Sequence, residues 1–249
     1  MKTVTMKIKT GVLQMLLAGI LILIISSCGK DQRRIKGSGP VITKTISLEQ
    51  ISGVSLSIDA NVWVTPGDTQ SVVIEAQNNI IQNIEKYVTS DGVWRIGFYD
   101  PVRKHDGITI YITTPHFDYA VISGSGSIRT DDLFAENSDV YLKISGSGNI
   151  VMHTSADHID SEISGSGNIT LNGSAGHHEI NISGSGKVNA FGLETGRTDC
   201  RISGSGNCEV WANDYLGVTI SGSGSVFYKG SPEIHTNISG SGGIHNVNN

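Results

Sequence analysis

A five-residue motif, ISGSG, recurs in the C-terminal half of the chain and constrains its fold more than any other feature. Its seven copies begin at residues 122, 144, 163, 182, 202, 220 and 238, so successive copies are 18 to 22 residues apart. Internal repeats with a period near 20 residues are typical of solenoids, in which each repeat forms one coil that stacks on the next. The motif therefore predicts a solenoid of about seven coils.

The residues around each motif alternate in the way that strands do. Most copies carry an apolar residue two positions before the isoleucine and an Ile, Val or Cys six positions after it. Such alternation predicts a strand on each side of the motif with one buried face. Glycine accepts positive φ and lets backbones approach closely, and stacked corners about 4.8 Å apart would exclude larger residues. We expect an all-β parallel β-helix in which ISGSG is a structural corner.

Residues 41–121 are less repetitive and are predicted to form an N-terminal β-rich cap and the first rungs, followed by the ISGSG-repeat β-helix at 122–249. Strands are expected at 51–58, 61–67, 71–77, 93–99 and 108–115. The apolar spacing in NIIQNIEKYV predicts a helix over 79–88. Solenoids need terminal units that cover their core. The polar ending IHNVNN predicts either a weak C-terminal cap or an edge that is open to a partner.

The first forty residues have the layout of an exported lipoprotein. Lys2, Lys7 and Lys9 precede a short apolar run, which is typical of a signal peptide, predicted here at 1–27. Ile25-Ser26-Ser27-Cys28 resembles the lipobox of bacterial lipoproteins, which implies that Cys28 is lipidated. Residues 28–40 are then a polar, lipidated tether. This layout predicts an outer-membrane lipoprotein, on the periplasmic face or the cell surface, with the membrane as a partner through the lipid anchor.

The charge of the chain argues against nucleic acid as a partner. The net charge is −5 for the whole chain, and the three lysines of the signal peptide contribute to it. After removal of residues 1–27 the chain is more acidic still and has no Lys/Arg-rich run. Binding to nucleic acid relies on a basic patch, so we expect none.

Two cysteines remain beyond Cys28. Cys200 and Cys208 flank one corner and occupy positions that are held by other apolar residues in most repeats. They are interpreted either as small buried apolar residues or as a disulfide across the corner, which an oxidising compartment would favour.

A mixed polar and aromatic series lies five positions before each motif isoleucine. Its members are Phe117, Asp139, His158, His177, Arg197, Tyr215 and Glu233. We expect a line along one outer edge, with His158, His177, Arg197 and Tyr215 as candidate surface-binding residues. His158 and His177 could chelate zinc with His153 or His178, but nothing in the spacing supplies a required third ligand. Solvated surface histidines are the preferred interpretation, and no metal or cofactor is predicted.

Carbohydrate-cleaving enzymes on β-helices need clustered carboxylates on one face. The local acidic groups are Asp131-Asp132 and Asp157, Asp160 and Glu162, with no matching pattern recognised in adjacent repeats. The sequence also has no G-x-S-x-G or H-E-x-x-H motif. These observations favour a protein that is not an enzyme.

The strand-rich opening that ends in ITIYITTPHFDYAVISGSG, followed by repeated ISGSGNI units, resembles the bacterial family named as a putative auto-transporter adhesin head domain. The resemblance spans about residues 41–244 and implies a parallel β-helix on an exported protein. The expected function is non-enzymatic adhesion, or binding of a glycan or an envelope protein. The alternatives are a structural or assembly component that forms a homo-oligomer through solenoid ends or sides, and a polysaccharide-active enzyme.

Overall fold

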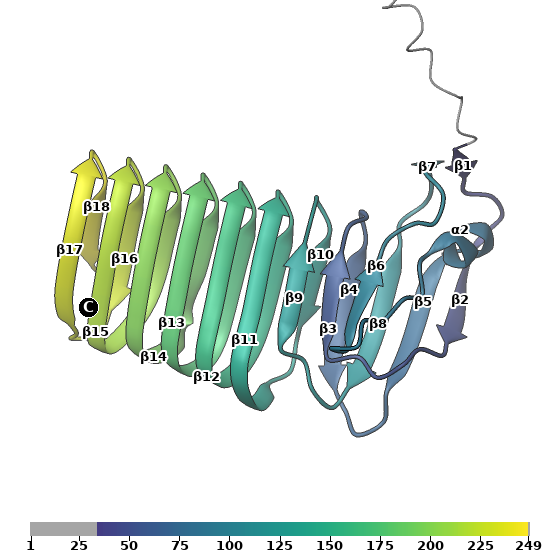
Figure 1. The fold of residues 1–249 in the computed structure, drawn as a ribbon, viewed down its shortest axis with the longest axis horizontal. Helices are drawn as coiled ribbons and strands as arrows, with labels where there is room; N and C mark the ends of the chain where they lie inside the picture. Colours follow the sequence, from purple (N-terminus) through teal and green to yellow (C-terminus); the bar gives the residue numbers. More distant parts are fainter. Residues whose placement is uncertain (1–33, 249) are drawn as a thin grey trace, which may run out of the picture.

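The ISGSG motifs join strands that lie on opposite walls of a parallel β-solenoid, seen in a computed structural model that describes residues 34–248 (Figure 1). The strands of the repeat region are β9 (Tyr119–Ile122), β10 (Ser127–Thr130), β11 (Phe134–Gly146), β12 (Asn149–Gly165), β13 (Asn168–Gly184), β14 (Lys187–Gly204), β15 (Asn207–Gly222), β16 (Ser225–Lys229), β17 (Glu233–Gly240) and β18 (Gly243–Asn246). We call wall A the strand segments that lead into each motif, and wall B the segments that leave it. The long strands β12 to β15 bend, so each contributes its first part to wall B and its last part to wall A.

The seven motif isoleucines form one column, as the repeat predicts. Ile144 pairs with Ile122 of the preceding coil and with Ile163 of the following one. The same parallel register continues through Ile182, Ile202, Ile220 and Ile238. The predicted parallel β-helix and its stacked corners are confirmed.

The two glycines of each corner are needed for different reasons. Gly184 has a φ of +124°, and a Cβ atom there would lie 2.5 Å from the carbonyl oxygen of Gly165 in the coil before it. Gly186 has no such φ, but its Cβ would lie 2.8 Å from the carbonyl oxygen of Gly167. Between them, the Ser185 N–H donates to the Gly165 carbonyl at 2.9 Å. The corner therefore tolerates no side chain at either position without displacing the coil below.

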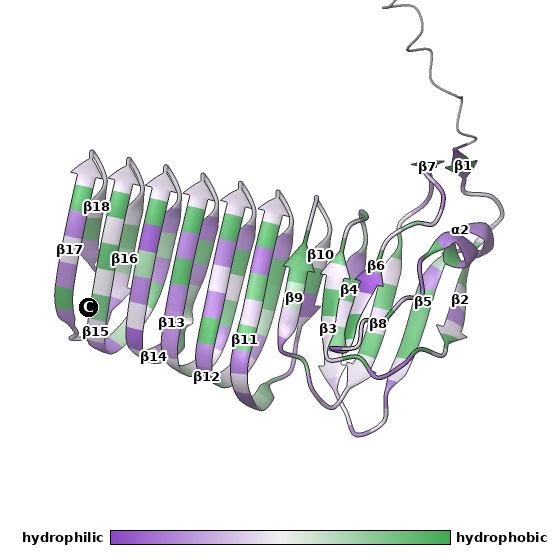
Figure 2. Ribbon diagram, viewed as in Figure 1, coloured by the Kyte–Doolittle hydropathy of each residue, from purple (hydrophilic) through white to green (hydrophobic). Residues whose placement is uncertain are grey.

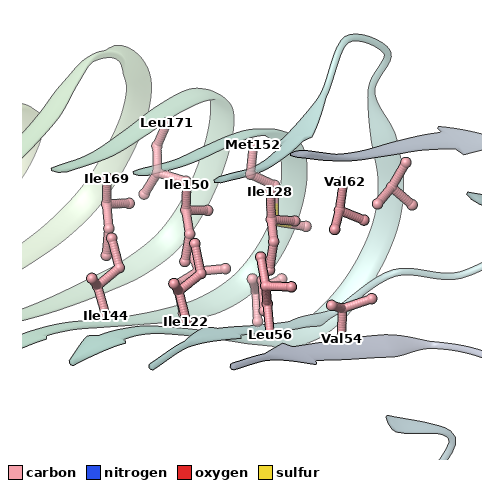
Figure 3. Close-up of a cluster of buried hydrophobic side chains, with 14 of the residues drawn as sticks. Val54, Leu56, Val62, Ile122, Ile128, Ile144, Ile150, Met152, Ile169 and Leu171 are labelled. Carbon is pink, nitrogen blue, oxygen red and sulfur yellow. The ribbon is translucent and has the colours of Figure 1, made fainter. Parts of the chain in front are cut away.

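The core fills the space between the two walls. In Figure 3, Ile122 and Ile144 from wall A face Ile128, Ile150 and Ile169 from wall B. Figure 2 shows the corresponding alternation of hydrophobic and hydrophilic residues along the strands. The buried residues form a single cluster that runs from Ile51 to Val226, so the N-terminal segment and the repeats share one core.

The N-terminal segment adds two coils in an order that differs from the sequence. Its elements are β1 (Ile35–Lys36), β2 (Val41–Ile46), β3 (Gly53–Leu56), β4 (Asn61–Pro66), β5 (Ser71–Gln77), α2 (Asn78–Asn83), β6 (Val93–Ile96), β7 (Val102–Lys104) and β8 (Thr109–Thr114). On wall A, β3 lies between β9 and β6; on wall B, β4 lies between β10 and β8. Strands β5 and β2 then extend wall B in antiparallel fashion. The expected N-terminal cap is thus built from two parallel coils and an antiparallel extension.

The predicted helix over 79–88 is wrong beyond residue 83. The helix α2 has no side-chain hydrogen bond at its N-cap and no acidic residue in its first turn, so little stabilises it beyond the burial of Ile80 and Ile81. From Ile84 the chain is extended and pairs with β6 and the segment just after it, through antiparallel bridges of Val88 with Trp94 and Ile84 with Phe98. The edge of β6 offers backbone partners that a longer helix would leave unused.

Strands β1 and β7 form a separate two-stranded parallel sheet. Among residues 34–248, no helix is long and apolar enough to cross a membrane.

Candidate binding surface on wall A

The structure aligns the polar series on the outer side of wall A. Asp139, His158, His177, Arg197, Tyr215 and Glu233 pair with one another in register across six consecutive coils. The expected first member does not belong to the line. Phe117 is 1% exposed and packs against Phe134 with ring centroids 5.8 Å apart; it precedes β9 and lies outside the paired register.

The four candidate binding residues lie in one continuous network. The ring centroids of His158 and His177 are 4.9 Å apart. His177 Nε2 lies 2.9 Å from Asp199 Oδ2, and Arg197 Nε donates to the same oxygen at 2.7 Å. The Arg197 guanidinium lies 3.9 Å from the centre of the Tyr215 ring, where cation–π attraction holds it in place.

The network continues to the last coil. The Tyr215 ring stacks on His235 with centroids 5.3 Å apart, and His235 Nε2 lies 2.8 Å from Glu233 Oε1. Burial acts to raise the pKa of Asp199, but its hydrogen bonds with Arg197 and His177 outweigh this effect and leave the pKa below its usual value. Asp199 is therefore the carboxylate that joins Arg197 and His177.

A column of carboxylates lies beside this line, and the sequence reasoning missed it. Asp160, Glu179 and Asp199 occupy the third position before the motif isoleucine in three adjacent coils, and they pair in register. Glu179 is neutralised by Arg201. Burial raises the pKa of Asp160, and Glu162 and Glu179 add to the rise. An alignment of the repeats, compared at the third position before the motif isoleucine, would reveal this column from the sequence.

Wall A is hollowed in several places, and one hollow of about 220 Å³ is lined by Asp199, Tyr215 and His235. Of two others, the first, of about 380 Å³, runs across five coils beside the corners. Its polar lining is Lys143, Glu162, Asn181, Arg201 and Thr219, together with the corner serines Ser164, Ser183, Ser203 and Ser221. The second, of about 630 Å³, lies over β3 and β6 next to the segment 84–91. Its polar lining is Ser52, Ser55, Ser57, Glu85, Thr89, Asp91, Arg95, Asp118 and Tyr119. Wall A thus combines hydroxyl, amide, charged and aromatic groups along its whole length.

The four histidines weighed as zinc ligands do not converge. His153 lies on wall B, where its Nδ1 is 2.8 Å from the Thr130 carbonyl oxygen. His178 points into the core, fully buried, with its Nε2 2.9 Å from the Ser161 hydroxyl. Burial, with smaller contributions from His177 and His158, lowers its pKa to about 3. Within residues 34–248, no three His, Cys, Asp or Glu side chains are placed to share a metal ion.

The remaining candidate residues are the cysteines. Cys200 and Cys208 are buried thiols whose Sγ atoms lie 2.9 Å apart, and burial raises the pKa of Cys208. They fill core positions on the two walls. Cys28 and the signal peptide lie outside the described residues.

The fold and this surface define a class: a parallel β-solenoid with a capped N-terminal end and a long polar wall. The chain belongs to the family described as "Putative auto-transporter adhesin, head GIN domain", whose sequence model matches residues 50–232. The resemblance drawn from the sequence is confirmed. No curated protein matches this chain.

Solved structures share the fold. A "putative adhesin" from Bacteroides fragilis is 22% identical with a TM-score of 0.76, covering 86% of this chain and 100% of its own. A "putative lipid binding protein" from Parabacteroides distasonis is 23% identical with a TM-score of 0.73, covering 87% of this chain and 100% of its own. A "putative adhesin" from Parabacteroides distasonis is 26% identical with a TM-score of 0.65, covering 86% of this chain and 100% of its own.

Proposed function

We propose that this chain is a non-enzymatic adhesion protein of the cell envelope, anchored by a lipid on Cys28, which binds a glycan or an envelope protein on wall A. The observation that carries the proposal is the continuous network from His158 to Glu233, which spans five coils on a single outer wall. Extended partners suit such a surface, because each coil presents one polar or aromatic side chain at a fixed spacing.

The pairing of the charged groups supports binding over catalysis. Asp199 is held by His177 and Arg197, and Glu162 by Lys143. Paired charges keep side chains in fixed positions, which favours recognition of a partner at low entropic cost. The family name and the names of the solved structures point in the same direction.

A matched pair of substitutions tests the location of the site. Arg197→Ala removes a guanidinium that lies over Tyr215 on wall A, whereas Arg129→Ala removes one that lies over Trp63 on wall B, 4.7 Å from the ring centre. The two side chains are similarly exposed, at 48% and 43%, and each also forms an ion pair with an aspartate two residues later. Both variants therefore lose the same kind of contact.

On arrays of polysaccharides and purified envelope proteins, we expect Arg197→Ala to weaken binding at least 10-fold and Arg129→Ala to leave it unchanged. This corresponds to about 1.4 kcal/mol of binding free energy or more. Equal losses in the two variants would place the site elsewhere. Release of reducing ends from a polysaccharide, abolished by Asp160→Asn, would instead favour the enzyme alternative, because the raised pKa of Asp160 is a property of general acids.

A further inference from the structure

The C-terminal end of the solenoid is an uncovered rung with a regular edge. Strand β17 pairs only with β15, and β18 only with β16, among the residues that the structure describes. Their outer backbone groups therefore lack partners from residues 34–248. In Figure 1, β17 and β18 lie on the two walls of the last coil, at the left end of the molecule.

The last rung also leaves core positions exposed. Ile234 and Ile238 are 39% and 38% exposed, whereas Leu216 and Ile220, which pair with them in the preceding coil, are at most 1% exposed. Ile244 on wall B is only half-buried. One further layer placed on this end would bury these side chains, and each buried CH₂ stabilises an association by about 0.8 kcal/mol.

Soluble proteins protect the edge strands of their sheets with lysines, prolines, bulges or inward charges. Strand β17 has eight residues, continuous register and none of these features. From Ser231 to the end of the chain there is no Lys, Arg or Asp, and Glu233 is the only acidic residue. Glu233 is the first residue of β17, where its carboxylate lies 2.8 Å from His235, so the rest of this edge strand brings no Asp, Glu, Lys or Arg charge to a meeting of two such ends.

The opposite end of the core is closed. Ile80, Ile81 and Ile84 are at most 1% exposed, and β2 places Lys44 in the middle of its edge. The C-terminal rung of one molecule therefore has no equivalent parallel rung to stack on at the N-terminal end of another. Head-to-tail growth is disfavoured, and the surface that can complete this rung is a second copy of the rung itself.

We propose that two copies of this chain associate end to end through β17 and β18, related by a two-fold axis perpendicular to the solenoid. Strands on the two walls of a coil run in opposite directions, so such an axis brings edge strands together in antiparallel pairs. Both walls then continue across the interface, and Ile234, Ile238 and Ile244 enter a shared core.

The arrangement has a consequence for adhesion, which rests on the anchor of the proposed function. Residues 34–36 lie at the end of the solenoid opposite to β17. In the dimer the two N-terminal ends point away from each other. Copies anchored in two facing membranes would meet at their C-terminal rungs, and the chain would act as its own adhesion partner.

The dimer is tested with purified protein in solution. The result of this test then does not depend on the lipid anchor or on ligand binding to wall A. For the purified protein, sedimentation velocity is expected to show a concentration-dependent dimer, and small-angle scattering a maximum dimension nearly twice that of the monomer. A protein that stays monomeric at the highest concentration, a side-by-side dimer, or larger oligomers would each overturn the proposal.

Substitutions locate the interface. Ile238→Lys and Thr236→Lys place a charge on exposed, inward positions of the last rung, and both should shift the dissociation constant at least 10-fold toward monomer. Thr236 is already polar and exposed, so its substitution does not endanger the fold. Thr219→Lys adds the same charge on the outside of wall A, one coil earlier, and should leave dimerisation unchanged. Dimers that persist in both end variants would place the interface elsewhere.

Discussion

At the scale of single residues, the corner glycines explain why one pentapeptide is repeated while the sequence between its copies varies. The positive φ of the first glycine is a property of its own backbone, whereas its clash with the carbonyl below is a property of the stack. The same clash is found at the first corner glycine of every coil that stacks on a preceding ISGSG corner. A side chain at any of these glycines therefore displaces the preceding coil as well as its own.

Gly184→Ala and Gly124→Ala separate these two effects. Both positions have positive φ, but a Cβ at Gly124 meets no atom within 4 Å, whereas one at Gly184 meets the Gly165 carbonyl oxygen. We expect Gly124→Ala to lower the free energy of unfolding by about 1 kcal/mol and Gly184→Ala by about 3 kcal/mol. Denaturant unfolding measures both. Equal losses would show that stacking adds nothing to the backbone strain.

His178 makes the stability of the fold depend on pH. Its pKa in the fold, about 3, lies below the ordinary value of 6.5, so below about pH 6.5 the unfolded chain binds a proton that the folded chain excludes. The free energy of unfolding therefore falls as the pH decreases from about 6.5 toward 3, by up to about 1.4 kcal/mol per pH unit.

His178→Thr should remove this part of the pH dependence, since Thr198 is fully buried at the aligned position of the next coil. Urea unfolding at pH 7.5 and pH 4.5 measures the slope of each protein. Asp199, with its lowered pKa, loses its contribution at still lower pH in both proteins, so the comparison isolates the histidine. Parallel slopes would mean that His178 is accessible to protons in the fold.

At the scale of elements, the repeat region could be predicted and the N-terminal coils could not. The stacking of β11 to β15 follows from a motif that aligns with itself, so the sequence alone defines which residues pair. Leu56 occupies the place of a motif isoleucine, but Ser57-Ile58-Asp59-Ala60 follows it in place of Ser-Gly-Ser-Gly. Without the glycines nothing marks this corner, and the order of β3 and β6 depends on contacts between distant segments.

The segment 79–88 shows a second limit. Its apolar spacing fits a helix, and of the five residues that the spacing marks, Ile80, Ile81, Ile84 and Val88 are buried, whereas Tyr87 is exposed. The pattern indicates which residues are buried, but it does not determine the backbone conformation. After Asn83 the backbone is extended because it hydrogen-bonds to the neighbouring strand. The N–H of Glu85 donates to the Gly97 carbonyl at 2.9 Å, and the Trp94 indole donates to the Glu85 carbonyl at the same distance. Such tertiary partners are invisible to a local pattern.

At the scale of the whole molecule, an alignment of the repeats predicts which side chains lie next to each other on the surface of neighbouring coils. The line from Asp139 to Glu233 was predictable because residues at equal distance from the motif share a column. Phe117 departs from it because it precedes β9 and lies outside the register that aligns the other members. The contacts of Asp199 with His177 of the previous coil and Arg197 of its own were not predictable, since they depend on side-chain directions between columns.

A lipid on Cys28, as proposed, would decide how this surface is presented. Cys28 precedes the described residues by a short segment, so a lipid there would attach the solenoid to the membrane by the end that carries β1, with the C-terminal rung farthest away. Two or three acyl chains bind a membrane far more strongly than one, because each buried CH₂ adds about 0.8 kcal/mol. Cys28→Ala should therefore move the protein from the membrane fraction to the soluble fraction of lysed cells. Ser27→Ala, which keeps a small residue before the cysteine, should leave it on the membrane. A Cys28→Ala protein that still sediments with membranes would show that some other part of the chain holds it there.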